Sequence, residues 1–144
     1  MTEITSAPDI SRIEIPMDIW TTPFWQAAAE ERLVLPCCGD CGTHRWPPGP
    51  FCPACRSQQV NWVPAGQAEL YSYTILRPPG ASPDEAAPLI VPGLVAFLEA
   101  GGLRIMAAIV GSPVGAVKIG APLVLGWVPK GDTRVPVFSI DLGS

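Results

Sequence analysis

The motif CCGDCG occupies residues 37–42, and a second motif, CPAC, follows at residues 52–55. Each Cys-x-x-Cys places two thiolates on one tight knuckle, and two facing knuckles satisfy a tetrahedral zinc ion at about 2.3 Å per sulfur. The ligand set expected from this spacing is Cys38, Cys41, Cys52 and Cys55. Four protein ligands leave no open coordination position, so we expect a structural rather than a catalytic ion.

Zinc is the expected metal, and iron in the same four-thiolate cage is the main alternative. A redox role for either motif is disfavoured because neither opens a helix in a βαβ setting. Gly42 suits the turn after the first pair, since glycine adopts positive φ without steric cost. Arg56 holds the matching place after the second pair, where its cation could offset the negative charge of a four-thiolate centre.

Cys37 and His44 are the other residues of this segment with potential chemistry. As a ligand, Cys37 would form a poorer knuckle with Cys41 than Cys38 does. His44 is the single histidine of the chain, and it could replace a ligand or act as a base for a Cys37 nucleophile. The favoured interpretation is an exposed loop histidine and a small buried thiol. Because the chain also lacks a G-x-S-x-G elbow and a P-loop, we expect no catalytic activity of its own.

The composition of the chain predicts its kind of secondary structure and argues against some kinds of partner. Eighteen prolines and fourteen glycines in 144 residues predict many turns and short strands. The formal net charge of −4 argues against nucleic acid as a partner, because phosphate backbones are bound by cationic surfaces. The sequence shows neither a signal peptide nor an apolar stretch that could span a membrane, so we expect a cytoplasmic protein. In that reducing compartment clustered cysteines indicate metal rather than disulfides.

A helix is expected from residue 22 to about residue 32, with Thr22 as its N-cap and Pro23 in the first turn. Residues 1–16 are polar and are expected to form an ill-ordered or partner-dependent lead. The aromatic residues in and before the helix are Trp20, Phe24 and Trp25. Two interpretations stay open for them: they pack on their own domain, or they dock a partner.

Beyond the cysteine motifs the hydrophobic period changes to two, which is typical of strands. Strands are expected over residues 69–76, 93–99, 102–110, 122–128 and 134–140, with a Pro-rich loop at 77–88. The first is expected to alternate, with Tyr71, Tyr73 and Ile75 on one face and Leu70 on the other. Five short strands with tight turns predict a mainly β protein built around a small barrel.

Several segments together resemble the DUF35 family of zinc-ribbon OB-fold acyl-CoA-associated proteins. They are LVLPCCGDCG (33–42), WPP (46–48), CPAC (52–55) and YSYT (71–74). The resemblance implies an N-terminal helical region (1–32), a rubredoxin-like zinc ribbon (33–62) and a C-terminal five-stranded OB-fold barrel (63–144). It matches the four cysteines above with the family's metal ligands, whereas Cys37 has no counterpart and Arg56 replaces a frequent glycine.

The resemblance also implies a function. Family members commonly act as partners of thiolase-fold enzymes, including thiolases, acyltransferases, hydroxymethylglutaryl-CoA synthases and steroid side-chain aldolases, and the partner holds the catalytic residues. We therefore expect a non-catalytic subunit that binds acyl-CoA or serves as a scaffold. A cation beside a flat apolar surface suits CoA phosphates. The candidate CoA contacts are Arg77, Arg104 and Lys130, each of which could equally be a solvated surface charge.

Two other functions are alternatives to this one. OB-folds with zinc modules often bind single-stranded nucleic acid, through a basic groove lined with aromatic side chains. The acidic charge balance disfavours this alternative. A stand-alone hydrolase or thioesterase using Cys37 would need a base and an oxyanion site that the sequence does not provide.

Overall fold

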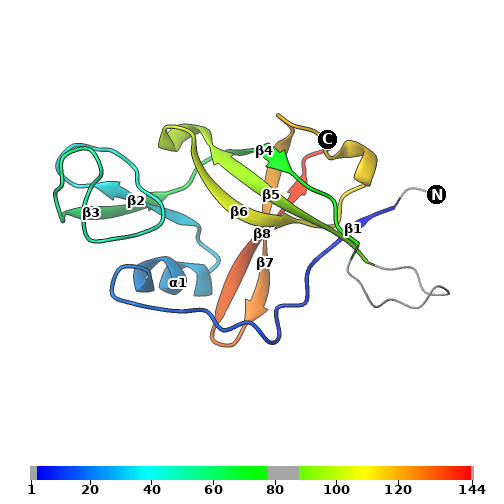
Figure 1. Cartoon of the computed structure of the whole chain (residues 1–144), viewed down its shortest axis with the longest axis horizontal. Helices are drawn as coiled ribbons and strands as arrows, with labels where there is room; N and C mark the ends of the chain where they lie inside the picture. Colours follow the sequence, from blue (N-terminus) through cyan, green and yellow to red (C-terminus); the bar gives the residue numbers. More distant parts are fainter. Residues whose placement is uncertain (1–2, 78–87, 144) are drawn as a thin grey trace.

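The computed structural model describes residues 3–77 and 88–143. The strands and the helix, in chain order, are β1 (Thr5–Ser6), α1 (Thr22–Ala29), β2 (Val34–Cys38), β3 (Val60–Pro64), β4 (Ala68–Tyr73), β5 (Leu89–Phe97), β6 (Leu103–Ile109), β7 (Pro122–Lys130) and β8 (Thr133–Ile140). Figure 1 shows β2 and β3 at the left end of the molecule, the barrel strands in the middle and to the right, and α1 at the lower left beside β7 and β8. The expected loop at 77–88 lies almost entirely outside the described residues.

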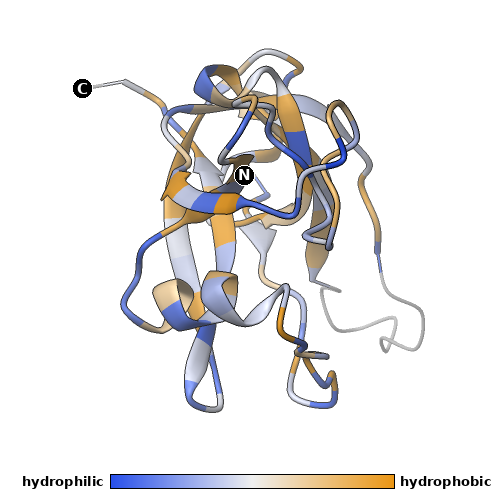
Figure 2. Ribbon diagram, turned by 90° about the vertical axis from the view of Figure 1, so that its left-hand side faces the viewer, coloured by the Kyte–Doolittle hydropathy of each residue, from blue (hydrophilic) through white to orange (hydrophobic). Residues whose placement is uncertain are grey.

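The C-terminal strands form a closed barrel, as the sequence predicts. Their order is β5-β4-β7-β8-β6, and pairing between β5 and β6 completes the ring. All these pairs are antiparallel except β6 with β8, which meet in parallel at Ile109 and Phe138. Figure 2 shows hydrophobic positions interspersed with hydrophilic ones along the strands, because one side of each strand faces the core.

The first barrel strand is shorter and less regular than predicted. β4 ends at Tyr73, and its pairing with β5 shifts between Leu70 and Ser72, which marks a β-bulge. Leu70 is 0% exposed and Tyr71 is 49% exposed, as alternation requires. A bulge adds one residue to one strand, however, so the strict alternation expected over residues 69–76 does not continue past it.

The start of α1 differs from the expectation by one residue. Thr21, rather than Thr22, is the N-cap. The Asp18 carboxylate accepts hydrogen bonds from the backbone N–H groups of Trp20 and Thr21, both at 2.8 Å. The pKa of Asp18 is lowered, and the main cause is the hydrogen bond from the Thr21 N–H, because it stabilises the ionised carboxylate. Thr22 lies inside the helix and donates its hydroxyl to the Asp18 carbonyl at 2.6 Å.

The lead before the helix is partly ordered, so the expectation of disorder is wrong for β1. Thr5 and Ser6 pair in parallel with Leu89 and Ile90 of β5. Thr5 is buried, and its backbone N–H donates to the Ser112 carbonyl at 2.9 Å. Backbone pairing at a sheet edge needs no particular side chain, which explains why the polar sequence gave no strand signal.

Helix α1 is fastened to the barrel by polar contacts to β8. The Thr133 hydroxyl donates to the Trp25 carbonyl at 2.8 Å, and the Arg134 guanidinium donates to the Ala29 carbonyl. The bond from Arg134 satisfies a carbonyl in the last turn of the helix, where no intrahelical partner is available. Within the described ranges, no helix is long and apolar enough to cross a membrane.

One hydrophobic core joins α1, the segment at the start of β2, and the barrel. Its buried members are Phe24, Leu33, Leu35, Ala65, Ala68, Leu70, Val91, Val95, Phe97, Ala100, Ile105, Ile109, Val117, Phe138 and Ile140. Leu33 and Leu35, at the start of β2, belong to this core. The strand that leads into the cysteine segment is therefore packed against the barrel and not merely connected to it by the chain. Strand β3, which pairs with β2, also crosses the boundary expected at residues 62–63.

We predict that Leu70→Ala lowers the free energy of unfolding by about 2–5 kcal/mol, because it leaves a cavity at a fully buried position. Chemical denaturation of the metal-loaded protein measures the change. Leu98→Ala, at a position that is 54% exposed, is the matched control and should change the free energy by about 0.5 kcal/mol or less. Equal destabilisation by both variants would contradict this description of the core.

Candidate metal centre and apolar cavity

The two knuckles have the same backbone geometry. The Gly42 N–H donates to the Cys38 carbonyl at 3.1 Å, and the Arg56 N–H donates to the Cys52 carbonyl at 2.9 Å. Gly42 and Arg56 both have positive φ, at 79° and 65°. Arg56 therefore occupies the place of a turn glycine, as its position in the sequence indicates. It does so at some steric cost, since L-residues other than glycine rarely adopt this conformation.

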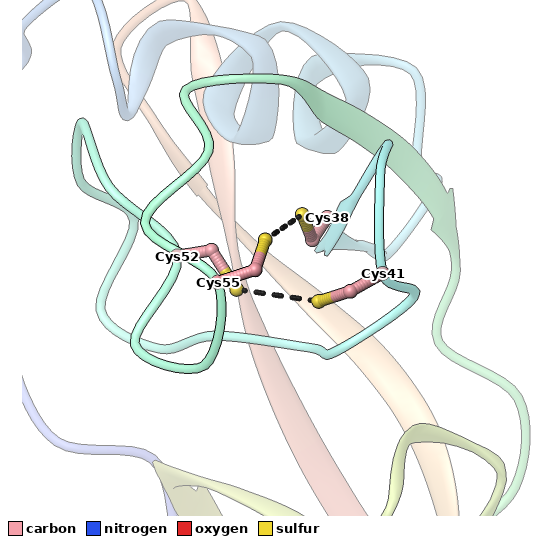
Figure 3. Close-up of side chains that lie close together, drawn as sticks. All are labelled: Cys38, Cys41, Cys52 and Cys55. Atoms are coloured by element: carbon pink, nitrogen blue, oxygen red, sulfur yellow. Dashed lines mark hydrogen bonds between the residues drawn. The ribbon is translucent and has the colours of Figure 1, made fainter.

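The four cysteine sulfur atoms of the knuckles converge (Figure 3). All of them lie within 4.8 Å of one another. The sulfur atoms of Cys38 and Cys55 are 3.6 Å apart, and those of Cys41 and Cys52 are also 3.6 Å apart. Disulfide sulfur atoms would be about 2.05 Å apart. Tetrahedral coordination at about 2.3 Å from a central ion gives sulfur–sulfur distances of about 3.8 Å. The arrangement therefore fits a tetrahedral metal ion and no disulfide.

The thiols of this cluster have divergent pKa values. Hydrogen bonds from the backbone N–H groups of Cys41 and Asp40 lower the pKa of Cys38 to about 6. At Cys55 the backbone N–H of Ser57 favours the thiolate, but the neighbouring thiols Cys38, Cys41 and Cys52 together raise the pKa to about 12. Four adjacent sulfur atoms cannot all be ionised without a cation among them. A bound divalent ion removes that conflict, because it stabilises every thiolate it contacts.

Cys37 lies outside the cluster. Its thiol donates to the Gly42 carbonyl at 3.3 Å. His44 faces Cys37 across an isolated antiparallel bridge, but no hydrogen bond joins their side chains in the part of the chain that the structure describes. The structure therefore shows no hydrogen-bonded base at the Cys37 thiol in His44.

An apolar cavity of about 550 Å³ lies where α1, β6, β8 and the cysteine segment meet. Phe24 and Trp25 of α1, Trp46 of the cysteine segment, and Arg104 and Met106 of β6 are among the residues that line it. The ring centroids of Phe24 and Trp25 are 4.9 Å apart, and those of Phe24 and Trp46 are 5.2 Å apart. The size and apolar lining are typical of a small-molecule site.

The three candidate CoA contacts are not gathered at this cavity. Arg104 lies at it, with its guanidinium 4.4 Å from the centre of the Tyr71 ring. Lys130 lines a second, smaller cavity that Trp25 also borders, and it donates to the Ser11 carbonyl at 3.0 Å. Arg77 is paired with both carboxylate oxygens of Glu3 at 2.6 Å.

The candidate partner contacts differ in how much of each side chain is exposed. Phe24 is 4% exposed and belongs to the core, so it has little surface left for a partner. Trp20 and Trp25 are partly exposed. The sequence analysis used Trp46 only as part of a family motif and did not expect Trp46 or Met106 at a ligand site, because the cavity they line forms between segments that are far apart in the chain.

A cysteine ribbon with two knuckles, followed by a closed five-stranded barrel, defines the zinc-ribbon OB-fold class of proteins. Residues 25–61 match the family model for the ChsH2 rubredoxin-like zinc ribbon domain, and residues 62–128 match the model for the ChsH2 C-terminal OB-fold domain. The chain belongs to the DUF35 family, as its sequence motifs indicate.

Two solved structures are similar to this chain. One, described as the Ltp2-ChsH2(DUF35) aldolase, is 32% identical with a TM-score of 0.76, and the match covers 90% of this chain and 100% of that one. The other is a DUF35 protein of unknown function from Sulfolobus solfataricus, with 16% identity and a TM-score of 0.62, covering 87% of this chain and 85% of that one. The second similarity concerns the fold alone.

A curated relative is the probable enoyl-CoA hydratase alpha subunit of Thermomonospora curvata. It is 38% identical over 118 residues, which cover 80% of this chain. The chain spans 36% of the length of that relative. Relatives of this chain are thus named as components of enzyme complexes.

We predict one metal ion per chain, bound by the four converging cysteines. Cys52→Ser should lose most of the metal, since it removes a buried ligand and a serine hydroxyl is a poor replacement for a thiolate. Elemental analysis by mass spectrometry gives the stoichiometry and separates zinc from iron. Cys37→Ser is the matched control and should retain the ion; full retention in Cys52→Ser would remove Cys52 from the ligand set.

Proposed function

We propose that this chain is the non-catalytic zinc-ribbon OB-fold component of an enzyme complex that acts on acyl-CoA thioesters, with the catalytic residues in a thiolase-fold partner. The observation that carries the proposal is the 32% identical structure, whose whole chain this one matches and whose description names a second component, Ltp2, and an aldolase activity. The relative described as an enoyl-CoA hydratase subunit points to CoA thioesters as the substrate class.

The proposed ion is zinc, and its role is structural. Four thiolates at two knuckles are the ligand set that structural zinc prefers, and they leave no position for a substrate. The support is the convergence of the cysteines, two of which, Cys38 and Cys52, are buried. Binding of such an ion contributes directly to folding, because the unfolded chain has no preformed site.

The proposed acyl-CoA site is the cavity beside α1. Its lining is mostly apolar, which suits the acyl group, and Arg104 is the cation at its edge. The Arg104 guanidinium stacks on Tyr71, which is itself half-exposed, and the stack presents a fixed positive charge next to a flat aromatic ring. Such a pair can contact a phosphate and an adenine, the two recognisable ends of CoA.

The proposed partner surface lies on the lead before α1. Ile13, Met17 and Ile19 of this segment are exposed, with Ile19 at 77%, and Trp20 follows directly. Exposed aliphatic side chains next to a tryptophan are typical of a protein interface. Phe24 is not part of this proposed surface because it is buried, whereas the side chains named here are accessible to a partner.

We predict that the zinc-loaded protein binds a bulky acyl-CoA more tightly than CoA alone, because the acyl group enters the cavity. Ala108→Trp, which fills the cavity, should abolish the difference, and Arg104→Gln should weaken both ligands by about tenfold. Isothermal titration calorimetry measures the affinities, and the thioester should be recovered intact. Arg12→Gln, on the exposed lead, is the control. An unchanged acyl preference in Ala108→Trp would refute this site.

We predict that the chain co-purifies with a thiolase-like protein encoded beside it, and that Ile19→Ser/Trp20→Ala abolishes this without unfolding the chain. Both residues keep exposed surface, so their loss should cost the interface more than the fold. Size-exclusion chromatography of the co-expressed pair reports the complex, and circular dichroism with zinc content reports the fold. Leu98→Ser, also exposed, should leave the complex intact. Full co-elution of the folded double variant would exclude this surface.

A further inference from the structure

The cysteine ribbon contains a buried cation without a counter-charge. Arg45 is 5% exposed. Its Nη1 donates to the Ser57 carbonyl at 3.3 Å, whereas Nε and Nη2 are buried and have no hydrogen-bond partner among the described residues. The ion pairs of the described segments involve other arginines, so no carboxylate there neutralises the guanidinium.

Burying a charged guanidinium costs free energy unless a negatively charged group lies nearby. Arginine stays protonated in proteins, so it cannot escape the cost of burial by losing its charge. A buried charge without a partner is strongly destabilising, and native structures normally supply a compensating group. The compensation for Arg45 must therefore come from a negative centre that is not a carboxylate of the described residues.

Arg45 lies between the two knuckles. Its backbone N–H donates to the Pro36 carbonyl at 3.1 Å, two residues before Cys38. The Ser57 carbonyl that its side chain contacts also accepts a bond from the Cys52 N–H at 2.9 Å. Through its backbone and its side chain, the residue thus touches the strand that leads into the first knuckle and the turn that closes the second.

We propose that Arg45 is the counter-cation of the metal centre. Four thiolates and one divalent ion carry a net charge of −2, whereas four neutral thiols carry none, so a fixed cation favours the loaded site. The loaded site in turn compensates the buried guanidinium. Among the described residues no N–H···S bond joins Arg45 to the cysteines, so its charge acts through space, where the protein interior screens less than water does. This inference rests on the metal site of the proposed function.

Arg56, which sequence reasoning favoured for this role, is less suited to it. It directly follows Cys55, but its side chain is exposed and solvent screens its charge. The two arginines therefore make a matched pair: both belong to the ribbon and carry the same charge, and they differ in burial.

The experiment measures zinc affinity of the full-length protein by competition with a chromophoric chelator at fixed pH. Arg45→Met removes the charge and keeps most of the side-chain volume, Arg45→Lys keeps the charge and loses the planar fork, and Arg56→Gln removes the exposed charge. We expect Arg45→Met to bind zinc about 10–100-fold more weakly, the range typical of residues that support a metal site indirectly. Arg45→Lys and Arg56→Gln should stay within about threefold of the unsubstituted protein.

Each other result overturns the proposal. Unchanged affinity in Arg45→Met would show that the charge has no influence on the ion. An equal loss in Arg45→Lys would assign the effect to the hydrogen bond with Ser57 or to packing, and it decides the matter even if Arg45→Met does not fold. An equal loss in Arg56→Gln would indicate a general charge effect. Failure of the unsubstituted protein to bind zinc would refute the metal centre itself, which distinguishes that failure from failure of this inference.

Discussion

The convergence of four sulfur atoms within 4.8 Å is the constraint on which the ribbon depends. Between β2 and β3 the chain runs from residue 39 to residue 59 without a helix or strand, and a two-stranded sheet such as β2–β3 has marginal stability by itself. Hydrogen bonds shape the two knuckles, and the hydrogen bond that the Ser57 hydroxyl donates to the Asp40 carboxylate joins one knuckle to the other. An ion shared by both knuckles would add a second connection, and it would also offset the repulsion between thiolates held this close together.

Phe24 connects this metal-dependent segment to the rest of the molecule. Its ring meets Trp25 on its own helix and Trp46 on the ribbon, both edge to face, and it is buried with the barrel residues of the core. Aromatic contacts of this geometry contribute beyond the area they bury. The helix is also held to β8 by Thr133 and Arg134. Helix, ribbon and barrel consequently form one packed unit.

The sequence predicts those features that depend on neighbouring residues. The spacing of the cysteines identified the converging thiols, and the period of two located the barrel strands to within a few residues. The features it did not predict depend on tertiary contacts. The bulge after Leu70 follows from pairing with β5, and the helix cap moved to Thr21 because Asp18 folds back on it. The burial of Arg45 and the contact between Trp46 and Phe24 arise from segments that meet only in the folded chain.

Because Trp46 lines the apolar cavity, a metal ion at the knuckles would influence ligand binding there. Trp46 and Pro47 lie in the loop between the two knuckles, and both line the apolar cavity. Cys41 and Cys52 stand at the ends of that loop, so an ion that joins these cysteines would also fix one wall of the cavity. The opposite wall belongs to the barrel, through Arg104 and Met106. Under the proposed function, zinc therefore determines the shape of an acyl-CoA site that it does not contact, which gives a non-catalytic subunit a physical reason to carry a metal.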